Sequence, residues 1–284
     1  MRTALVTGAS DGIGAAAARM LHRQGWQVAV IGRNPERTHQ VARELGALAY
    51  VADFSRLAEV QTLAERLLRD YPRIDLLAHN AGGIFSKQPL TGDGHEMTFQ
   101  VNHLAPFLLT RLMQERLLDC KARVISTSSV AHRSIGLFFN LADVDRPRHY
   151  SQHLAYGNAK LANILFTREL HRRLGGKGIS AAAYHPGMVH TSFSKNSNSF
   201  MRLAYSGLFS KLLGMLTPEQ GADTLLWLAE GQPGVDWQPG EYYVRRAPAA
   251  TSRKAKDGEL ARALWEKSER LCAPFLTGAP KNDL

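Results

Sequence analysis

Apolar positions along the chain follow two kinds of pattern. Short apolar runs rich in β-branched residues predict strands, and stretches with apolar residues three or four positions apart predict helices between them. The strands are expected at Thr3–Thr7, Gln27–Gly32, Ala47–Val51, Ile74–Asn80, Arg123–Ser128 and Ser180–His185. The helices are expected at Gly14–Gln24, Pro35–Leu45, Ser55–Arg69, Glu96–Asp119 and about Leu154–Leu174.

This alternation predicts an α/β fold with a doubly wound parallel sheet of the Rossmann type. Strands that alternate with helices form a parallel sheet covered on both faces, and right-handed crossovers join parallel neighbours. The chain shows no internal repeat and no linker rich in Gly, Pro or Ser. We therefore expect a single domain over residues 1–284, with its core at about 3–245.

Two segments depart from this alternation of strands and helices. Residues 132–153 and 195–217 are long and lack a clear period, and such loops are usually functional or mobile. The apolar stretch at about 193–217 is predicted to fold over the substrate as a lid, although its side chains could also simply pack against the body of the protein. Residues 257–272 predict an amphipathic C-terminal helix.

Composition narrows the class of protein. Of the 284 residues, 44% are hydrophobic and 21% are charged, which excludes an intrinsically disordered chain. No apolar run reaches the ~18 residues that a transmembrane helix needs, and the first predicted strand follows Arg2 directly, which does not fit a signal peptide. Cys120 and Cys272 lie far apart, without disulfide-framework or metal spacing. We expect a cytoplasmic location and no metal.

The net charge is strongly basic and has several interpretations. The chain has 35 Lys and Arg against 25 Asp and Glu, a net charge of +10. Such a charge could attract nucleic acid, an anionic membrane surface or a cofactor rich in phosphate. Basic residues cluster only at Arg245–Arg246 and Arg253–Lys256, so most of them are interpreted as solvated surface and no nucleic-acid partner is predicted.

A glycine-rich turn follows the first strand. Residues 7–14 read TGASDGIG and lead into a helix rich in alanine. Glycines there allow close approach to a pyrophosphate, and the helix N-terminus supplies unpaired N–H groups; an ordinary strand-to-helix turn is the alternative. The candidate cofactor-binding residues of this turn are Gly8, Ser10, Asp11, Gly12, Ile13 and Gly14.

A second constellation carries acid–base chemistry. Tyr156 and Lys160 are four residues apart on a predicted helix and share one face, where an ammonium lowers the pKa of a phenol towards the working pH. Such a phenol can exchange a proton with an alcohol oxygen, although a surface pair is the alternative. Ser128 and Ser129 follow a strand whose carboxyl end should face the same crevice, where a hydroxyl can donate to a substrate oxygen.

These motifs occur in one order along the chain, and together they resemble the short-chain dehydrogenase/reductase family. The other features that carry the resemblance, over about residues 3–245, are Asp53-Phe54, Asn80-Ala81-Gly82, Asn102, and His185-Pro186-Gly187 with Thr191. Longer stretches resemble its retinol-dehydrogenase-like branch, which includes oxidoreductases carrying WW domains. These stretches are VNHLAPFLLT at 101–110, SSVAH at 128–132, AYGNAKLANILFTREL at 155–170 and HPGMVHT at 185–191.

The resemblance implies a role for each matched residue. Tyr156 would be the proton donor or acceptor, Lys160 would tune it and hold the nicotinamide ribose, and Asn102 would support a water-linked proton relay. Ser129 would orient the substrate oxygen, with Ser128 left as an alternative. The further cofactor contacts implied are Asp53, Phe54, Asn80, Ala81, Gly82, Pro186, Gly187, Val189 and Thr191. His79 stands where the family usually has asparagine, and we expect it to pack in its strand.

The end of the second predicted strand bears on the choice of nicotinamide. An acidic residue there would bind the adenosine 2′-hydroxyl of NAD. Arg33 stands there instead and could pair with a 2′-phosphate, although it could also simply face solvent. Asp11 argues slightly against this interpretation, because many NADP-using relatives have a basic residue in the glycine turn. The sequence therefore predicts NADP(H).

The combined expectation is a reversible oxidoreductase acting on a small molecule. Hydride would pass between NADP(H) and a lipophilic carbonyl or alcohol, retinoid-, steroid- or aldehyde-like. One alternative is a non-catalytic redox sensor that binds NADP, although such proteins tend to lose the tyrosine or the lysine. Another is a sugar-nucleotide epimerase, which usually has wider glycine spacing and a larger C-terminal domain. The sequence leaves a homo-oligomer open.

Overall fold

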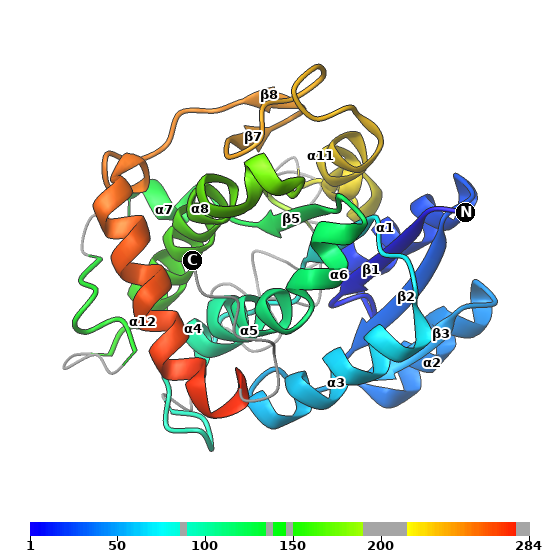
Figure 1. Ribbon diagram of the computed structural model, residues 1–284, viewed down its shortest axis with the longest axis horizontal. Coiled ribbons are helices and arrows are strands. Elements are labelled where there is room, and N and C mark those ends of the chain that lie inside the picture. The colour runs from blue at the N-terminus through cyan, green and yellow to red at the C-terminus, as the bar shows by residue number, and fades with distance from the viewer. Residues whose placement is uncertain (86–89, 135–138, 146–149, 190–214, 277–284) are drawn as a thin grey trace.

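A sheet of eight strands runs through the centre of the protein, with helices on both faces (Figure 1). This computed structural model describes residues 1–85, 90–134, 139–145, 150–189 and 215–276. The strand order is β3-β2-β1-β4-β5-β6-β7-β8. The strands are β1 (Thr3–Thr7), β2 (Gln27–Gly32), β3 (Leu48–Val51), β4 (Leu76–His79), β5 (Arg123–Thr127), β6 (Ser180–His185), β7 (Tyr242–Val244) and β8 (Ala247–Pro248).

Strand direction confirms the predicted doubly wound α/β fold. Strands β1 to β7 pair in parallel, and Leu5 of β1 lies opposite Ala29 of β2 and Leu77 of β4. Only the short β8 runs antiparallel, against β7. The order reverses between β1 and β4, and ligands bind outside the carboxyl ends of parallel strands at such a point.

Successive side chains of each strand pack alternately into two separate hydrophobic cores, one on each face of the sheet. Ala4 and Val6 point to one face, together with α1 (Gly12–Arg23), α2 (Pro35–Glu44) and α11 (Pro218–Glu230). Leu5 points to the other face, where α3 (Leu57–Asp70), α5 (Ala105–Leu112) and α8 (Gln152–Leu174) cover the sheet. Because successive strand residues face opposite sides, strands buried on both faces read as continuous apolar runs.

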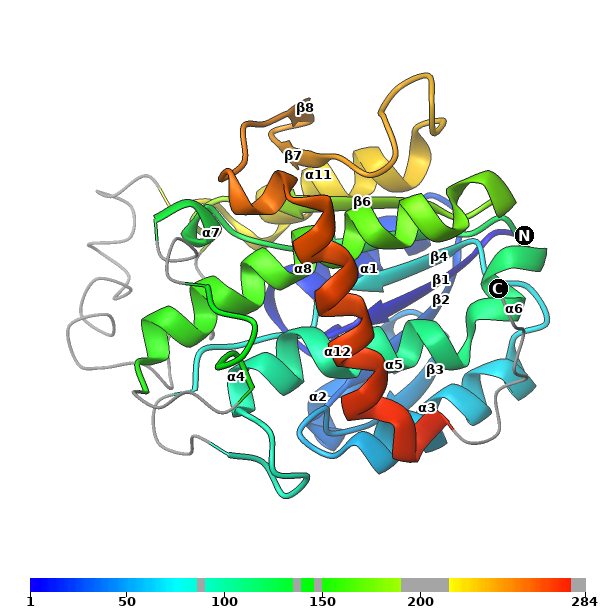
Figure 2. The same ribbon diagram turned by 60° about the vertical axis from the view of Figure 1, so that its left-hand side comes forward.

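The C-terminal helix α12 (Gly258–Leu276) forms an outer layer across α8 and α5 (Figure 2). Trp265 of α12 stacks on Phe166 of α8, with ring centroids 5.9 Å apart, and meets the edge of Phe107 of α5 at 5.0 Å. A 3-10 turn, η5 (Lys254–Lys256), leads into it. The helix thereby extends the core on the side of the sheet that carries α8.

The long helix expected at 96–119 is divided into four parts. These are α4 (Met97–Phe99), the π-helical turn η1 (Gln100–Leu104), α5 and α6 (Gln114–Asp119). Pro106 has no N–H, so it cannot bond to the carbonyl of Asn102 four residues earlier, and the turn there widens.

Other elements were not predicted from the sequence. They are α7 (Ala131–Ser134), η3 (Gly175–Lys177), α11, η5, β7 and β8. Of the predicted lid, residues 193–214 lie outside the described residues, whereas Leu216 is described and its N–H donates to the carbonyl of Met188 at 2.8 Å.

Candidate active site

A cavity of about 490 Å³ opens at the carboxyl ends of the strands. It extends from the glycine turn after β1 to the segment after β6. Most of the residues singled out in the sequence line it, although they come from seven separate stretches of chain. They are Gly8, Ser10, Asp11, Gly12, Ile13, Arg33, Asp53, Phe54, Asn80, Ala81, Gly82, Ser129, Tyr156, Lys160, Pro186, Gly187 and Val189.

The glycine turn leaves no room for side chains. Gly8 has a φ of +67°, and a Cβ there would lie 2.8 Å from the Cα of Ala81. A Cβ on Gly14 would lie 2.3 Å from the carbonyl oxygen of Gly8, so Gly14 packs the turn from behind and does not line the cavity. Helix α1 begins at Gly12, which lines the cavity together with Ile13, and the Gly12 N–H donates to the Asp11 carboxylate at 2.7 Å. This cradle fits a pyrophosphate.

The loop after β4 is fixed from both sides. Thr7 Oγ1 accepts from the backbone N–H groups of Asn80 and Ala81, each at 3.0 Å. The Asn102 side chain binds both backbone groups of Gly83. Its Nδ2 donates to the Gly83 carbonyl at 3.0 Å, and its Oδ1 accepts from the Gly83 N–H at 3.3 Å. A Cβ on Gly82 would lie 2.4 Å from Asn102 Oδ1. Asn102 thus braces the cavity wall and is not part of its lining.

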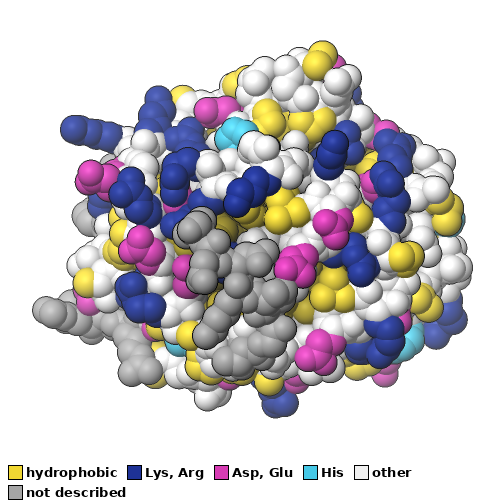
Figure 3. All heavy atoms as spheres, viewed as in Figure 1, with side chains coloured by type: hydrophobic (Ala, Val, Ile, Leu, Met, Phe, Trp, Pro, Cys, Tyr) yellow, Lys and Arg dark blue, Asp and Glu magenta, His cyan; other side chains and the backbone are white. Residues whose placement is uncertain are grey.

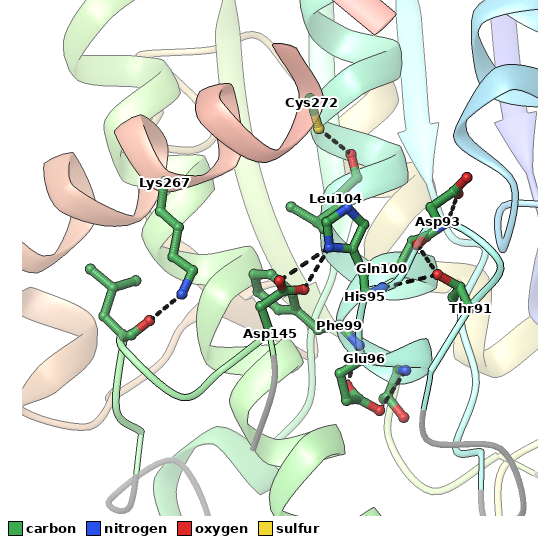
Figure 4. A network of polar contacts seen from close by, with 12 residues as sticks. Thr91, Asp93, His95, Glu96, Phe99, Gln100, Leu104, Asp145, Lys267 and Cys272 are labelled. Carbon is green, nitrogen blue, oxygen red and sulfur yellow. Dashed lines mark hydrogen bonds and ion pairs between the residues drawn. The ribbon is translucent and has the colours of Figure 1, made fainter. Parts of the chain in front are cut away.

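The segment that carries Asn102 rests on a buried polar network (Figure 4). The Glu96 carboxylate caps α4 by accepting from the N–H groups of Thr98 and Phe99, at 2.8 and 2.6 Å. His95 Nδ1 lies 3.0 Å from the carboxylate of Asp145. Burial raises the pKa of the Glu96 carboxyl above its usual range. The network anchors the π-helical turn to the segment that contains Asp145.

Tyr156 and Lys160 occupy successive turns of α8 and both line the cavity. Lys160 Nζ lies 5.4 Å from the centroid of the Tyr156 ring and donates to the carbonyl of Thr127 at 3.2 Å. The lysine is only 3% exposed, and burial lowers the pKa of its ammonium to about 7. A cation held in this position favours the phenolate form of the tyrosine.

The two serines after β5 differ in what their hydroxyls contact. The Ser128 hydroxyl is buried and donates to the carbonyl of Lys160 at 2.7 Å. The Ser129 hydroxyl accepts from the N–H of Ala131 at 3.3 Å, which leaves its own proton to be donated. This arrangement suits Ser129 better to a substrate oxygen. His79, as expected, packs away from the site, with Nε2 2.7 Å from Thr110 Oγ1.

One end of the cavity is basic. Arg33 and Arg37 both line it and are exposed, and Arg37 Nη1 pairs with Asp11 Oδ2 at 3.0 Å. The sequence analysis missed Arg37, although a signal was present. Asn34, a typical capping residue, stands directly before Pro35 in the sequence, and its Oδ1 accepts from the N–H of Arg37 at 2.9 Å, which fixes Arg37 in the first turn of α2 beside Arg33.

The other end of the cavity is more apolar. Val130 is 48% exposed and Met188 is 59% exposed, and both line the cavity together with Ile84 and Phe85. His185 also lines it, and burial lowers the pKa of its imidazole to about 4. The predicted contact Thr191 lies outside the described residues.

A second hollow in the described surface, lined among others by Arg168, His171 and Glu241, contains none of the predicted site residues. Basic and acidic side chains are interspersed on the face seen in Figure 3. Within the described ranges, no group of three or more His, Cys, Asp or Glu residues could hold a metal ion. None of the helices in those ranges is long and apolar enough to cross a bilayer.

Comparison with known proteins gives a consistent picture. The sequence profile described as short chain dehydrogenase matches residues 2–202. A Streptomyces sp. (strain C5) protein named "Putative daunorubicin C-13 ketoreductase DnrU" is 42% identical over 94% of this chain and 91% of its own length. Mouse retinol dehydrogenase 12 is 35% identical over 94% of this chain and 85% of its own.

A solved structure extends the comparison to the fold. A protein from Mycobacterium paratuberculosis has a TM-score of 0.75 and 34% sequence identity to this chain. The match covers 96% of this chain and 94% of the other.

Proposed function

Because this chain belongs to the short chain dehydrogenase family of oxidoreductases, we propose that it exchanges a hydride reversibly between NADP(H) and a lipophilic carbonyl or alcohol. The observation that carries this proposal is the convergence of three groups on one cavity. The Tyr156 phenol, the Lys160 ammonium and the Ser129 hydroxyl line the same space as the glycine turn. Sites of this kind combine acid–base chemistry with a place for a dinucleotide.

Each of the three groups has a distinct task. When bound, the nicotinamide supplies the hydride donor or acceptor. In carbonyl reduction the Ser129 hydroxyl donates to the substrate oxygen, and Tyr156 delivers the proton to that oxygen as negative charge develops there. Lys160 stabilises the phenolate that remains. In alcohol oxidation Tyr156 takes the proton back.

Other residues would hold the cofactor. The N–H groups at the start of α1 would bind the pyrophosphate, and the loop Asn80–Gly82 would lie along the ribose and nicotinamide. Asn102 would act mainly by fixing this loop, because its side-chain amide already bonds to Gly83 and to Thr98. A water-linked relay at this turn would then involve backbone groups and not the amide.

The preference for NADP over NAD would come from the basic end of the cavity. A 2′-phosphate adds negative charge there, and guanidinium groups bind phosphate with charge-assisted, often bidentate hydrogen bonds. Arg33 and Arg37, which both line the cavity, would share this charge. Asp11, which stands in the glycine turn, is already paired with Arg37 and therefore opposes an incoming phosphate less than its sequence position suggests.

A lipophilic substrate is proposed because the open end of the cavity is apolar. Val130 and Met188 expose large side chains there, which water solvates poorly, and a nonpolar ligand would cover them. The relatives' names include a putative daunorubicin C-13 ketoreductase and retinol dehydrogenases. The core at about 3–245, the lid at about 193–217 and the extension at about 257–272 would together form one catalytic domain.

A substrate screen tests this proposal. The oxidation of NADPH by the full chain, followed by absorbance, would be measured with daunorubicin, retinal, steroid ketones, long-chain aldehydes and quinones, and each reaction would be repeated with NADH. We expect turnover with at least one lipophilic carbonyl and a preference for NADPH. Tight NADPH binding without turnover on any class would indicate the redox sensor instead. Turnover restricted to small hydrophilic carbonyls would contradict the substrate class.

A further inference from the structure

A buried histidine joins the catalytic serine's backbone to the C-terminal part of the chain. The His132 side chain is fully buried, at 0% exposure, on α7 directly after Ser129. Its Nδ1 lies 2.6 Å from the carbonyl oxygen of Ser129. Its Nε2 lies 3.4 Å from the backbone nitrogen of Ser252, 120 residues further on. Both ring nitrogens are therefore engaged.

The chemistry of the two partners fixes the state of the ring. A carbonyl oxygen can only accept a hydrogen bond and a backbone N–H can only donate one. His132 must therefore carry its proton on Nδ1 and leave the Nε2 lone pair to accept from Ser252. This is one tautomer of the neutral imidazole. Burial, the largest influence, lowers the pKa of the ring and favours that neutral form.

The hydrogen bond to Ser129 bears directly on the direction of the serine hydroxyl. The Ser129 carbonyl accepts from the His132 ring and also from the His132 backbone N–H at 3.2 Å. The same short turn brings the N–H of Ala131 to the Ser129 hydroxyl at 3.3 Å. One turn, from Ser129 to His132, thus sets both the plane of the peptide after Ser129 and the position of Ser129 Oγ. The His132 side chain adds a hydrogen bond to this turn.

The far side of the ring is held by the end of the sheet. Tyr242 of β7 meets the His132 ring edge-on, with centroids 5.0 Å apart. The Tyr242 hydroxyl is buried and has no hydrogen-bond partner among the described residues. Ser252, between β8 and η5, is itself buried and holds the start of η5 through the N–H of Ala255. Both nitrogens and one side of the His132 ring are therefore in contact with other parts of the fold.

We propose that His132 is a positioning residue that orients Ser129 towards the substrate oxygen, through the Nδ1–H bond to the Ser129 carbonyl. The proposal rests on the proposed function, because it acts through the role given there to Ser129. His132 is not among the residues that line the cavity. Loss of its Nδ1–H donor should let the Ser129 turn relax, and a misplaced catalytic group lowers the rate constant for turnover while cofactor binding persists.

Two matched substitutions separate positioning from packing. In His132→Asn the amide nitrogen takes the place of Nδ1 and can still donate to the Ser129 carbonyl. In His132→Gln the longer amide reaches the place of Nε2 and meets Ser252 instead. Both variants lose the ring contact with Tyr242. We expect His132→Asn to keep kcat within about threefold, and His132→Gln to lose up to about 10²-fold, each with NADPH affinity unchanged.

A double-mutant cycle with Ser129→Ala tests the route of the effect. If His132 acts only through the Ser129 hydroxyl, His132→Gln should lower kcat much less in the Ser129→Ala background than in the wild type. Tyr242→Phe is the control variant, because it keeps the ring against His132 and removes only a hydroxyl without a partner. It should have wild-type kcat and KM.

The outcomes distinguish this inference from the proposed function. Equal losses in His132→Asn and His132→Gln, or an undiminished loss in the Ser129→Ala background, would overturn the positioning role and leave the enzyme assignment intact. A parallel loss of NADPH binding would do the same. A wild-type chain without turnover on any carbonyl would overturn the proposed function, and this inference with it.

Discussion

Lys160 buries its ammonium against the ring of Tyr156, with Nζ 5.4 Å from the ring centroid, at the base of the cavity. A buried cation is costly unless something negative compensates for it. The carbonyl of Thr127 is its nearest described hydrogen-bond acceptor, at 3.2 Å, and a neutral dipole offsets only part of the cost. The site therefore holds a charge that the fold alone does not favour, which is typical of a functional position.

Replacing Lys160 by methionine should stabilise the fold and abolish turnover. The pKa of Lys160 is lowered to about 7 in the folded state, below its ordinary value of 10.5. Between these values the unfolded chain binds more protons, so the stability of the wild type rises with pH. The free energy of unfolding of Lys160→Met should thus exceed that of the wild type by on the order of a few kcal/mol below about pH 7. The advantage should shrink towards about pH 10.

Urea unfolding at about pH 6 and about pH 9 measures this difference. The Thr127 carbonyl keeps a partner in the variant, because Asn163 Nδ2 donates to it at 3.0 Å. The substitution therefore leaves no buried acceptor unsatisfied. A variant that is less stable than the wild type at both pH values would show that the ammonium is already compensated in the fold.

Replacing Tyr156 by phenylalanine should separate binding from chemistry. Only the phenol oxygen is lost, and general acid–base catalysis contributes about 10²- to 10⁴-fold. We expect kcat to fall by about that factor, while the affinity for NADPH, followed by fluorescence titration, changes less than about twofold. Full activity in Tyr156→Phe would assign the proton to another group.

Replacing either arginine at the basic end of the cavity should affect one cofactor only. Arg33→Ala and Arg37→Ala should each weaken NADPH binding about 10-fold, because each removes a charge-assisted contact to the 2′-phosphate. NADH lacks that phosphate, so its affinity should hardly change. Calorimetric titration of both cofactors gives the comparison. Arg43→Ala on the last turn of α2 is the control, since Arg43 does not line the cavity. Equal losses for NADPH and NADH would refute the assignment.

The strands were predictable because parallel strands leave a simple signature. Each is a short run buried on both faces, and the expected boundaries agree with β1, β2 and β6 to the residue. The hairpin β7–β8 could not be found this way. Its two-residue turn is formed by Arg245 and Arg246 with φ of +51° and +60°, where glycine or asparagine would have been the recognisable signal.

The candidate site was predictable in its residues but not in its contacts. The order of the motifs selects Tyr156, Lys160 and the glycine turn without any knowledge of distance. It does not indicate that the Asn102 amide is occupied by Gly83, because that bond joins segments 19 residues apart through a π-helical turn that periodicity does not reveal. The resemblance favours Ser129 over Ser128, but only the fold shows that the Ser128 hydroxyl is turned onto α8.

Two core histidines should make the protein sensitive to acid. His79 and His103 are 3% and 1% exposed, and burial lowers the pKa of each imidazole to about 3, against an ordinary value of 6.5. The unfolded chain therefore binds more protons between these values, and stability should fall as the pH drops below about 6.5, by up to about 1.4 kcal/mol per pH unit for each histidine. Thr110 Oγ1 and Ser268 Oγ each donate their proton to a backbone carbonyl, so the Nε2 of His79 and of His103 must donate to these hydroxyl oxygens. Glutamine can replace that donor without titrating.

His79→Gln and His103→Gln should thus each flatten the dependence of the urea midpoint on pH between about pH 6 and about pH 4.5, even though each lowers stability at neutral pH. An unchanged slope in both variants would mean that other groups govern the acid transition.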